Sequence, residues 1–65
     1  MNTQHEQPLL LSVDAARRLA GIGRTLMYSK ILSGEIESVK CNARRLIPRA
    51  SLERFVQRLV EEQNR

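Results

Sequence analysis

Apolar residues recur at helical spacing in the first part of this chain. They fall at i, i+3, i+6 and i+7 on Val13, Ala16, Leu19 and Ala20, which predicts one apolar stripe on a helix. Ser12 stands directly before this stripe and can accept hydrogen bonds from the free amides of a first helical turn. Gly21 stands directly after it and suits the left-handed backbone that ends many helices. We therefore predict a helix over residues 13–20.

A second helical stretch is predicted over residues 24–32. Its inward-facing residues are expected to be Leu26, Met27 and Ile31, and Ser33-Gly34 ends it. The two helices are joined by Gly21-Ile22-Gly23, in which Ile22 is expected to pack between them and Gly23 to be a poor N-cap. This order of two helices joined by a glycine-framed turn predicts a helix-turn-helix motif. In such a motif the second helix presents its first turn to the major groove of DNA.

The spacing changes from helical to extended after Gly34. We predict strands at residues 38–40 and 45–47, joined by a hairpin tip at Asn42, which tolerates positive φ. A two-stranded hairpin is unstable alone, so it must lean on the helices. Pro48 ends the second strand, and Leu9-Leu10-Leu11 is expected to form an extended segment against the core.

A last helix is predicted from residue 49 or 50 to residue 61. Its stripe is the clearest in the chain and consists of Leu52, Phe55, Val56 and Leu59. The pattern as a whole predicts a mainly α domain with a small β-hairpin, a winged helix-turn-helix. We expect this domain to span residues 9–61, between a flexible N-terminal arm (residues 1–8) and a flexible C-terminal tail (residues 62–65).

Length and charge narrow the class of protein. A chain of 65 residues buries only about 60% of its unfolded surface, so its core is thin. The net charge is +4, and the 11 Lys and Arg residues lie mostly between positions 17 and 58, which is typical of nucleic-acid binders when the cations share a face. No apolar run could span a bilayer, and the start lacks the order of a signal peptide. We expect a cytoplasmic, nucleoid-associated protein of a prokaryote or phage, with no membrane partner.

Residues that carry metal or catalytic chemistry are scarce. Cys41 is the one cysteine, which excludes an internal disulfide and a zinc site of the usual spacing and fits a reducing compartment. His5 is the one histidine and falls in the predicted arm. Gly21-Ile22-Gly23 lacks the third glycine and the preceding strand of a dinucleotide site. We predict no metal, no cofactor, no catalytic residue and no enzyme activity.

The second predicted helix carries the side chains expected to contact DNA. Arg24 and Thr25 lie in its first turn, where Arg can bind guanine O6 and N7 through two hydrogen bonds and Thr can contact a phosphate or a thymine methyl. Tyr28 and Ser29 follow one turn later on the expected outer face. The Tyr28 hydroxyl suits a phosphate oxygen; the alternative is a partly buried ring, and both can hold at once.

The hairpin adds a second basic set, formed by Lys40, Asn42, Arg44 and Arg45. We interpret it as a wing that enters the neighbouring minor groove or grips its phosphates. The alternative is a charged edge strand that discourages aggregation. Because side chains alternate along a strand, Lys40 and Arg45 need not face the same way as Arg44.

The first and last predicted helices carry further arginines. Arg17 and Arg18 either brace the DNA backbone or simply solubilise the first helix. Arg54 and Arg58 are expected on the solvated face of the last helix, in weak ion pairs with glutamates of that helix. Cys41 is expected to be structural filler at the end of its strand.

The motifs also carry a resemblance to a known family. They are Ser12-Val13-Asp14-Ala15-Ala16, Gly21-Ile22-Gly23-Arg24-Thr25, Tyr28, Ile31, Gly34-Glu35-Ile36, Ser38-Val39-Lys40, Arg44-Arg45, Ile47-Pro48-Arg49, Leu52 and Phe55. In this joint spacing the chain resembles the small excisionase-like DNA-binding domains, relatives of the MerR-type winged helix-turn-helix group. The resemblance implies that Arg24, Thr25 and Tyr28 lie on a recognition helix and Arg44 and Arg45 on a wing.

Two positions depart from the family pattern. Asn42 stands where a wing glycine is usual, and Lys30 stands where an apolar residue is usual. The first departure leaves the shape of the wing tip open. The second predicts a second helix whose inner face is rotated or looser.

The family resemblance also implies a role in mobile genetic elements such as prophages. An excisionase binds and bends double-stranded DNA at an attachment site, often with cooperative self-association, and steers an integrase towards excision during DNA recombination. Other members are transcription regulators. We predict an excisionase, with a small transcriptional regulator as the alternative and a basic adaptor for an acidic protein partner as the alternative from another class.

Overall fold

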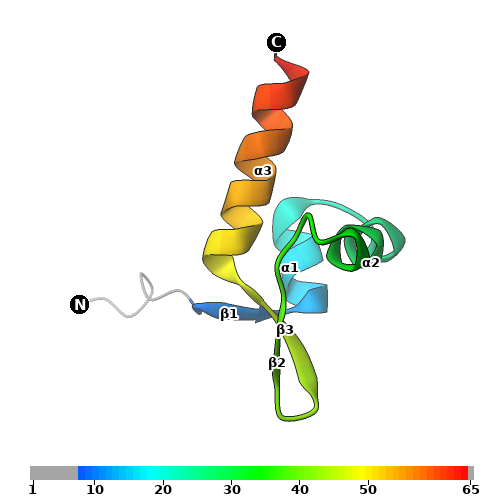
Figure 1. The fold of residues 1–65 in the computed structure, drawn as a ribbon, viewed down its shortest axis with the longest axis vertical. Coiled ribbons are helices and arrows are strands. Elements are labelled where there is room, and N and C mark those ends of the chain that lie inside the picture. The colour runs from blue at the N-terminus through cyan, green and yellow to red at the C-terminus, as the bar shows by residue number, and fades with distance from the viewer. Residues whose placement is uncertain (1–7, 65) are drawn as a thin grey trace, which may run out of the picture.

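The computed structural model describes residues 8–64. Their elements follow in the order β1 (Leu10–Ser12), α1 (Val13–Ala20), α2 (Arg24–Ser33), β2 (Val39–Cys41), β3 (Arg44–Pro48) and α3 (Arg49–Gln63). The β2–β3 hairpin projects from one end of the molecule and the C-terminal part of α3 from the opposite end, with α2 beside α1 (Figure 1). This architecture confirms the predicted winged helix-turn-helix. The predicted N-terminal arm lies, apart from Pro8, outside the described residues.

The sheet contains one strand more than the predicted hairpin. Its order is β1-β3-β2 with both pairs antiparallel. β1 belongs to the segment expected to be extended, and its Leu11 pairs with Ile47 of β3. The hairpin loop is shorter than predicted and consists of Asn42-Ala43, because β2 and β3 continue to Cys41 and Arg44. The φ angle of Asn42 is +58°, as the predicted tip requires.

Capping groups fix the two ends of α1. The Ser12 Oγ accepts a hydrogen bond from the Ala15 amide at 3.0 Å, which confirms the predicted N-cap. Gly21 has φ +78°, and the amides of Gly21 and Ile22 donate to the carbonyls of Arg18 and Arg17 at 3.2 and 3.0 Å. This pair of bonds is a Schellman motif, and Ile22 packs against the core beyond it.

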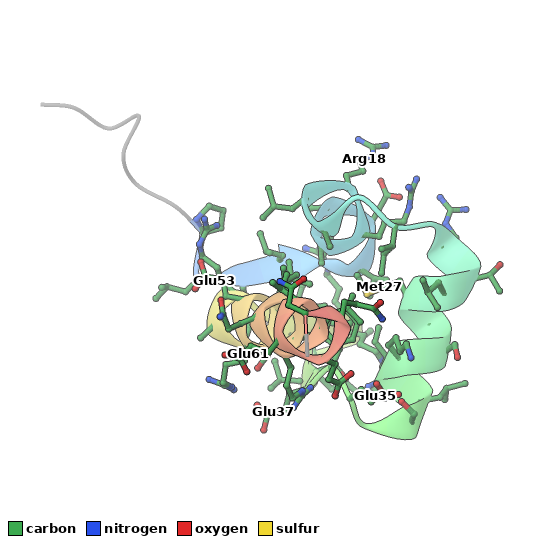
Figure 2. The ribbon with its side chains drawn as sticks, turned by 90° about the horizontal axis from the view of Figure 1, so that it is seen from above. Arg18, Met27, Glu35, Glu37, Glu53 and Glu61 are labelled. Atoms are coloured by element: carbon green, nitrogen blue, oxygen red, sulfur yellow. The ribbon has the colours of Figure 1, made fainter. Side chains whose placement is uncertain are left out.

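The core lies between the helices and one face of the sheet. Its buried apolar residues are Leu11, Val13, Ala16, Met27, Ile36, Ile47, Leu52 and Phe55. Met27 points from α2 into this interior (Figure 2). Met27 therefore anchors α2 to the core, and α1 packs against both α2 and α3.

Several residues predicted to face inward are exposed instead. Leu26 lies about 100° around α2 from the buried Met27, and Leu19 lies about 60° from the buried Ala16 and about 120° from the buried Val13, at the edge of its stripe. The predicted stripes were therefore too wide. Leu59 is exposed because α3, with 15 residues and therefore about 22 Å long, extends beyond the body of the domain. Val56 is exposed because it borders an open groove together with Leu19. α3 ends at Gln63, so residues 62 and 63 of the predicted tail are helical, because nothing in the sequence after residue 61 breaks a helix.

Candidate nucleic-acid interface

The outer face of α2 gathers the side chains predicted to contact DNA. Arg24, Thr25, Tyr28, Ser29, Leu32 and Ser33 line one shallow depression on this face. Their spacing follows successive turns of the helix, which is why one surface collects them. Tyr28 is 45% exposed, so part of its side chain is buried against the domain and part is accessible to solvent. α2 begins without a side-chain cap, because Gly23 offers none, and this confirms the poor N-cap.

Leu32 belongs to the same face and was not among the predicted contacts. It is 87% exposed and lies eight positions after Arg24, at helical spacing on the outer side. Its apolar character gave no signal of a DNA contact, and only the helical spacing could have placed it here. It gives this polar face one apolar side chain of the kind that packs against thymine methyl groups.

A carboxylate on α1 brings three arginines to the start of α2. Asp14 Oδ1 accepts from Arg17 Nε at 2.9 Å and from Arg24 Nη2 at 3.3 Å, while Oδ2 pairs with Arg18 Nη2 at 2.9 Å. Arg17 and Arg18, predicted only as a brace or as solubilising charge, therefore lie beside Arg24. Figure 2 shows Arg18 pointing away from the body of the domain.

The neighbouring arginines lower the pKa of Asp14. Desolvation alone would raise the pKa of the carboxyl, but the hydrogen bond from Arg24 and the charges of Arg18 and Arg17 outweigh it. The resulting pKa lies below the ordinary value of an aspartate. Asp14 is therefore ionised at neutral pH.

Lys30 lies in the last turn of α2. Its Nζ pairs with Glu35 Oε2 at 3.3 Å, and Met27 remains fully buried. The looser or rotated inner face predicted from Lys30 stays a prediction, because Met27 is buried on α2 while Leu26, which was expected to face inward, is exposed. Hydrogen bonds from Lys30 and Ser33 lower the pKa of Glu35 below its ordinary value.

The register of the hairpin divides its basic residues between two faces. Lys40 pairs with Arg45, and Cys41 pairs with Arg44. Residues opposite one another share a face and neighbours along a strand do not, so Lys40 and Arg45 lie on one face and Arg44 on the other. Arg45 Nη1 also donates to Ser38 Oγ at 2.8 Å. Asn42 and all three basic side chains of the hairpin are exposed.

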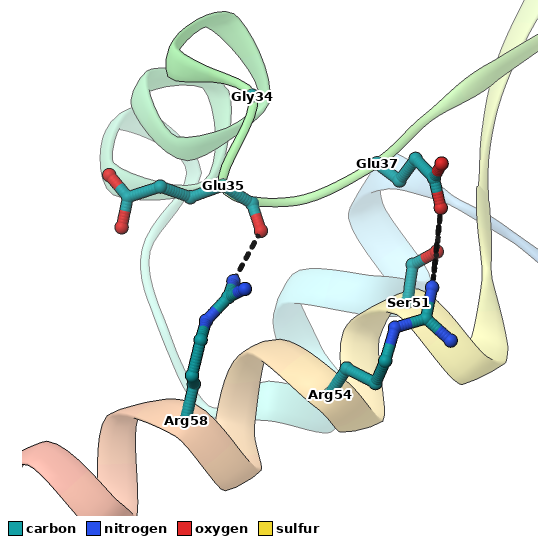
Figure 3. Close-up of a pocket in the computed structure, with 6 residues that line it drawn as sticks. All are labelled: Gly34, Glu35, Glu37, Ser51, Arg54 and Arg58. Atoms are coloured by element: carbon teal, nitrogen blue, oxygen red, sulfur yellow. Dashed lines mark hydrogen bonds and ion pairs between the residues drawn. The ribbon is translucent and has the colours of Figure 1, made fainter.

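Arg54 and Arg58 have structural partners that the sequence did not suggest. Arg54 Nη2 donates to Glu37 Oε1 at 3.3 Å, and Arg58 Nη2 donates to the Glu35 carbonyl at 2.9 Å. The buried Ser51 donates to the same Glu37 oxygen at 2.9 Å. Figure 3 shows these contacts joining α3 to the segment between α2 and β2. The predicted pairing with glutamates of α3 is wrong, because this segment folds back along the helix.

The remaining features add no chemistry to this surface. Cys41 is exposed at the end of β2, so it does not fill interior space as predicted. Among residues 8–64, no three His, Cys, Asp or Glu side chains gather in a way that would hold a metal ion. Within the same part of the chain, no helix has the length and apolar character needed to cross a membrane.

Comparisons with known proteins agree with this architecture. A family model described as "Helix-turn-helix domain" matches residues 10–60. A protein of Saccharopolyspora erythraea named "Probable excisionase" is 41% identical over 56 residues, which are 86% of this chain and 57% of that protein. The chain thus spans little more than half the length of this relative. No solved structure matches the chain.

Proposed function

From the membership of this chain in the helix-turn-helix domain family, we propose that it binds double-stranded DNA sequence-specifically and acts as an excisionase. The observation that carries this proposal is the exposed outer face of α2. Arg24 and Thr25 stand in its first turn, the part of a recognition helix that reaches base edges. Tyr28 and Ser29 follow at the distance of one turn and offer hydroxyls to phosphates.

The hairpin supports a second contact with DNA as a wing. Its Lys40 and Arg45 lie directly opposite one another, and like charges in this position destabilise a strand pair. An anionic phosphate bound between them offsets that repulsion. Protection of an edge strand against aggregation, the alternative role of these residues, does not require two cations to face one another. Arg44, on the other face, contacts the backbone of the adjoining groove.

The specific role as an excisionase is supported by the relative named "Probable excisionase". In this role the chain binds and bends DNA at an attachment site and favours excision by an integrase. A single small module buries roughly 600–1,000 Å² on DNA, so we propose that neighbouring copies bind cooperatively. Val60, exposed on α3, is a candidate contact between copies.

Selection from a random-sequence duplex pool tests DNA recognition and identifies the preferred site in the same experiment. The enriched sequence is then located in the genome, and its position next to an integrase gene or next to a promoter is recorded. An excisionase raises excision by the adjacent integrase in a reconstituted reaction, whereas a regulator changes transcription and leaves excision unaltered. A basic adaptor enriches no sequence at all, and that result contradicts the proposal.

A further inference from the structure

The contact between Asp14 and Arg24 differs from the other ion pairs of its cluster. Arg17 and Arg18 pair with Asp14 within α1, at i+3 and i+4, where such pairs contribute a few tenths of a kcal/mol. Arg24 reaches the same carboxylate from another helix, across the turn. Its side chain is 69% exposed, against 24% for Arg17. Arg17 is thus positioned to hold the Asp14 carboxylate in place. The carboxylate is in turn positioned to hold the Arg24 side chain.

The geometry leaves Arg24 able to bind a base while it remains on Asp14. A guanidinium has five N–H donors, and Arg24 donates to Asp14 through Nη2 alone, at 3.3 Å. The donors on Nη1 and the second donor on Nη2 stay available, and these two nitrogens form the fork that matches guanine O6 and N7.

The negative charge of Asp14 affects a phosphate contact and a base contact of Arg24 differently. A carboxylate close to Arg24 repels a phosphate that approaches the same guanidinium, because both are anions. It has no comparable effect on the uncharged edge of a guanine. We infer that Asp14 is a positioning residue that orients Arg24 towards a base and disfavours its contact with phosphates. This inference rests on the proposed function.

Asp14→Asn is the direct test, with Glu53→Gln as its matched control. Both substitutions remove one negative charge and an ion pair, but Glu53 pairs with Arg49 on α3, away from α2. We expect Asp14→Asn to lower the ratio of affinities for the selected and random duplexes roughly tenfold, while binding to random duplex becomes stronger. Glu53→Gln should strengthen binding to both duplexes by similar factors and leave the ratio unchanged.

The double variant Asp14→Asn/Arg24→Ala identifies the route of the effect. If Asp14 acts through Arg24, adding Asp14→Asn to Arg24→Ala changes the ratio no further. An equal loss in both backgrounds, or an unchanged ratio in Asp14→Asn, overturns the inference. If the wild-type chain itself shows no preference, the proposed function fails instead.

Thermal unfolding of each variant separates misfolding from altered recognition. If Asp14→Asn does not fold, Asp14→Ala takes its place, because it also removes the carboxylate beside Arg24 and alanine has the highest helix propensity. The same loss of the affinity ratio is then expected. A folded Asp14→Ala variant with the full ratio contradicts the role of Asp14.

Discussion

Arg24 is the residue on which sequence recognition is expected to depend most. Arg24→Ala should reduce discrimination at one base position by about 1–3 kcal/mol, because a bidentate contact to one base pair is lost. Binding to the selected duplex and to duplexes with single base-pair changes measures this loss. If the variant discriminates at every position as well as the wild type, α2 is not the recognition helix.

Arg44 is expected to act on affinity and not on discrimination. Arg44→Ala should weaken binding to all duplexes alike and reduce the slope of log affinity against log salt by about 1, because one phosphate contact is removed. Titrations of selected and random duplex over a range of salt give both quantities. A loss confined to the selected duplex would instead assign base contact to this face of the wing.

Asp14 and Glu35 are expected to make the free energy of unfolding decrease at acid pH. In both carboxyls the pKa is lower in the folded chain than its ordinary value, so their contribution is present above the unfolded pKa of about 4. It is lost as the pH falls through the lower, folded pKa, because the unfolded chain then binds more protons. Denaturant unfolding should show this loss below about pH 5, and Asp14→Asn/Glu35→Gln should show a flatter profile. Parallel profiles for the two proteins would exclude this role for the carboxyls.

At the scale of elements, the turn between α1 and α2 offers a matched pair of glycines. Gly23 has φ −78° and ψ 167° and no side-chain cap, and a Cβ added there meets nothing within 4 Å. Gly23→Ser should therefore stabilise the domain by a few tenths of a kcal/mol. Gly21 has equal space but φ +78°, so Gly21→Ser should destabilise it by about 1 kcal/mol. The midpoint temperatures of thermal unfolding of the two variants should shift in opposite directions, by a few degrees each. Shifts of the same sign would contradict the capping argument.

The helices could be predicted because their ends are encoded locally. Ser12, Gly21 and Gly34 each act within a few residues of the backbone groups that they satisfy, so their roles are visible in a short window of sequence. The third strand could not be predicted in this way. β1 is three residues long, and its pairing with β3 depends on a chain reversal through two intervening helices.

The sequence predicted most of the residues that share the outer face of α2, with Leu32 as an exception, but not the contacts between these residues and other elements. Helical spacing placed Arg24, Thr25 and Tyr28 on one face. The contacts of Asp14 with Arg24 and of Arg58 with the Glu35 carbonyl join segments far apart in sequence, and side chains of these types are common on surfaces. Only the folded chain shows which of them meet.

At the scale of the molecule, α2 packs beside α1, and the β2–β3 wing projects from one end of the domain (Figure 1). Hydrogen bonds of Glu37 join the segment before β2 to Ser51 and Arg54 of α3. Cys41, the one cysteine of the chain, is exposed on the wing and provides a probe of this geometry.

Disulfide cross-linking through Cys41 should map the position of the wing on DNA. We expect cross-links to thiol-modified nucleotides in the groove next to the one bound by α2, and loss of these cross-links in Cys41→Ser. The variant should bind with unchanged affinity, because Cys41 fills no interior space. Cross-links spread evenly along the duplex would contradict a fixed wing contact.

The most direct test of the proposed function is the affinity of the wild-type chain for its selected duplex and for random duplex at physiological salt. If the outer face of α2 reads base edges, the selected duplex should bind at least about 10³-fold more tightly, and both affinities should fall steeply with salt. Equal affinity for the two duplexes would show that the basic surface attracts DNA without reading it, and would contradict sequence-specific recognition by this helix-turn-helix.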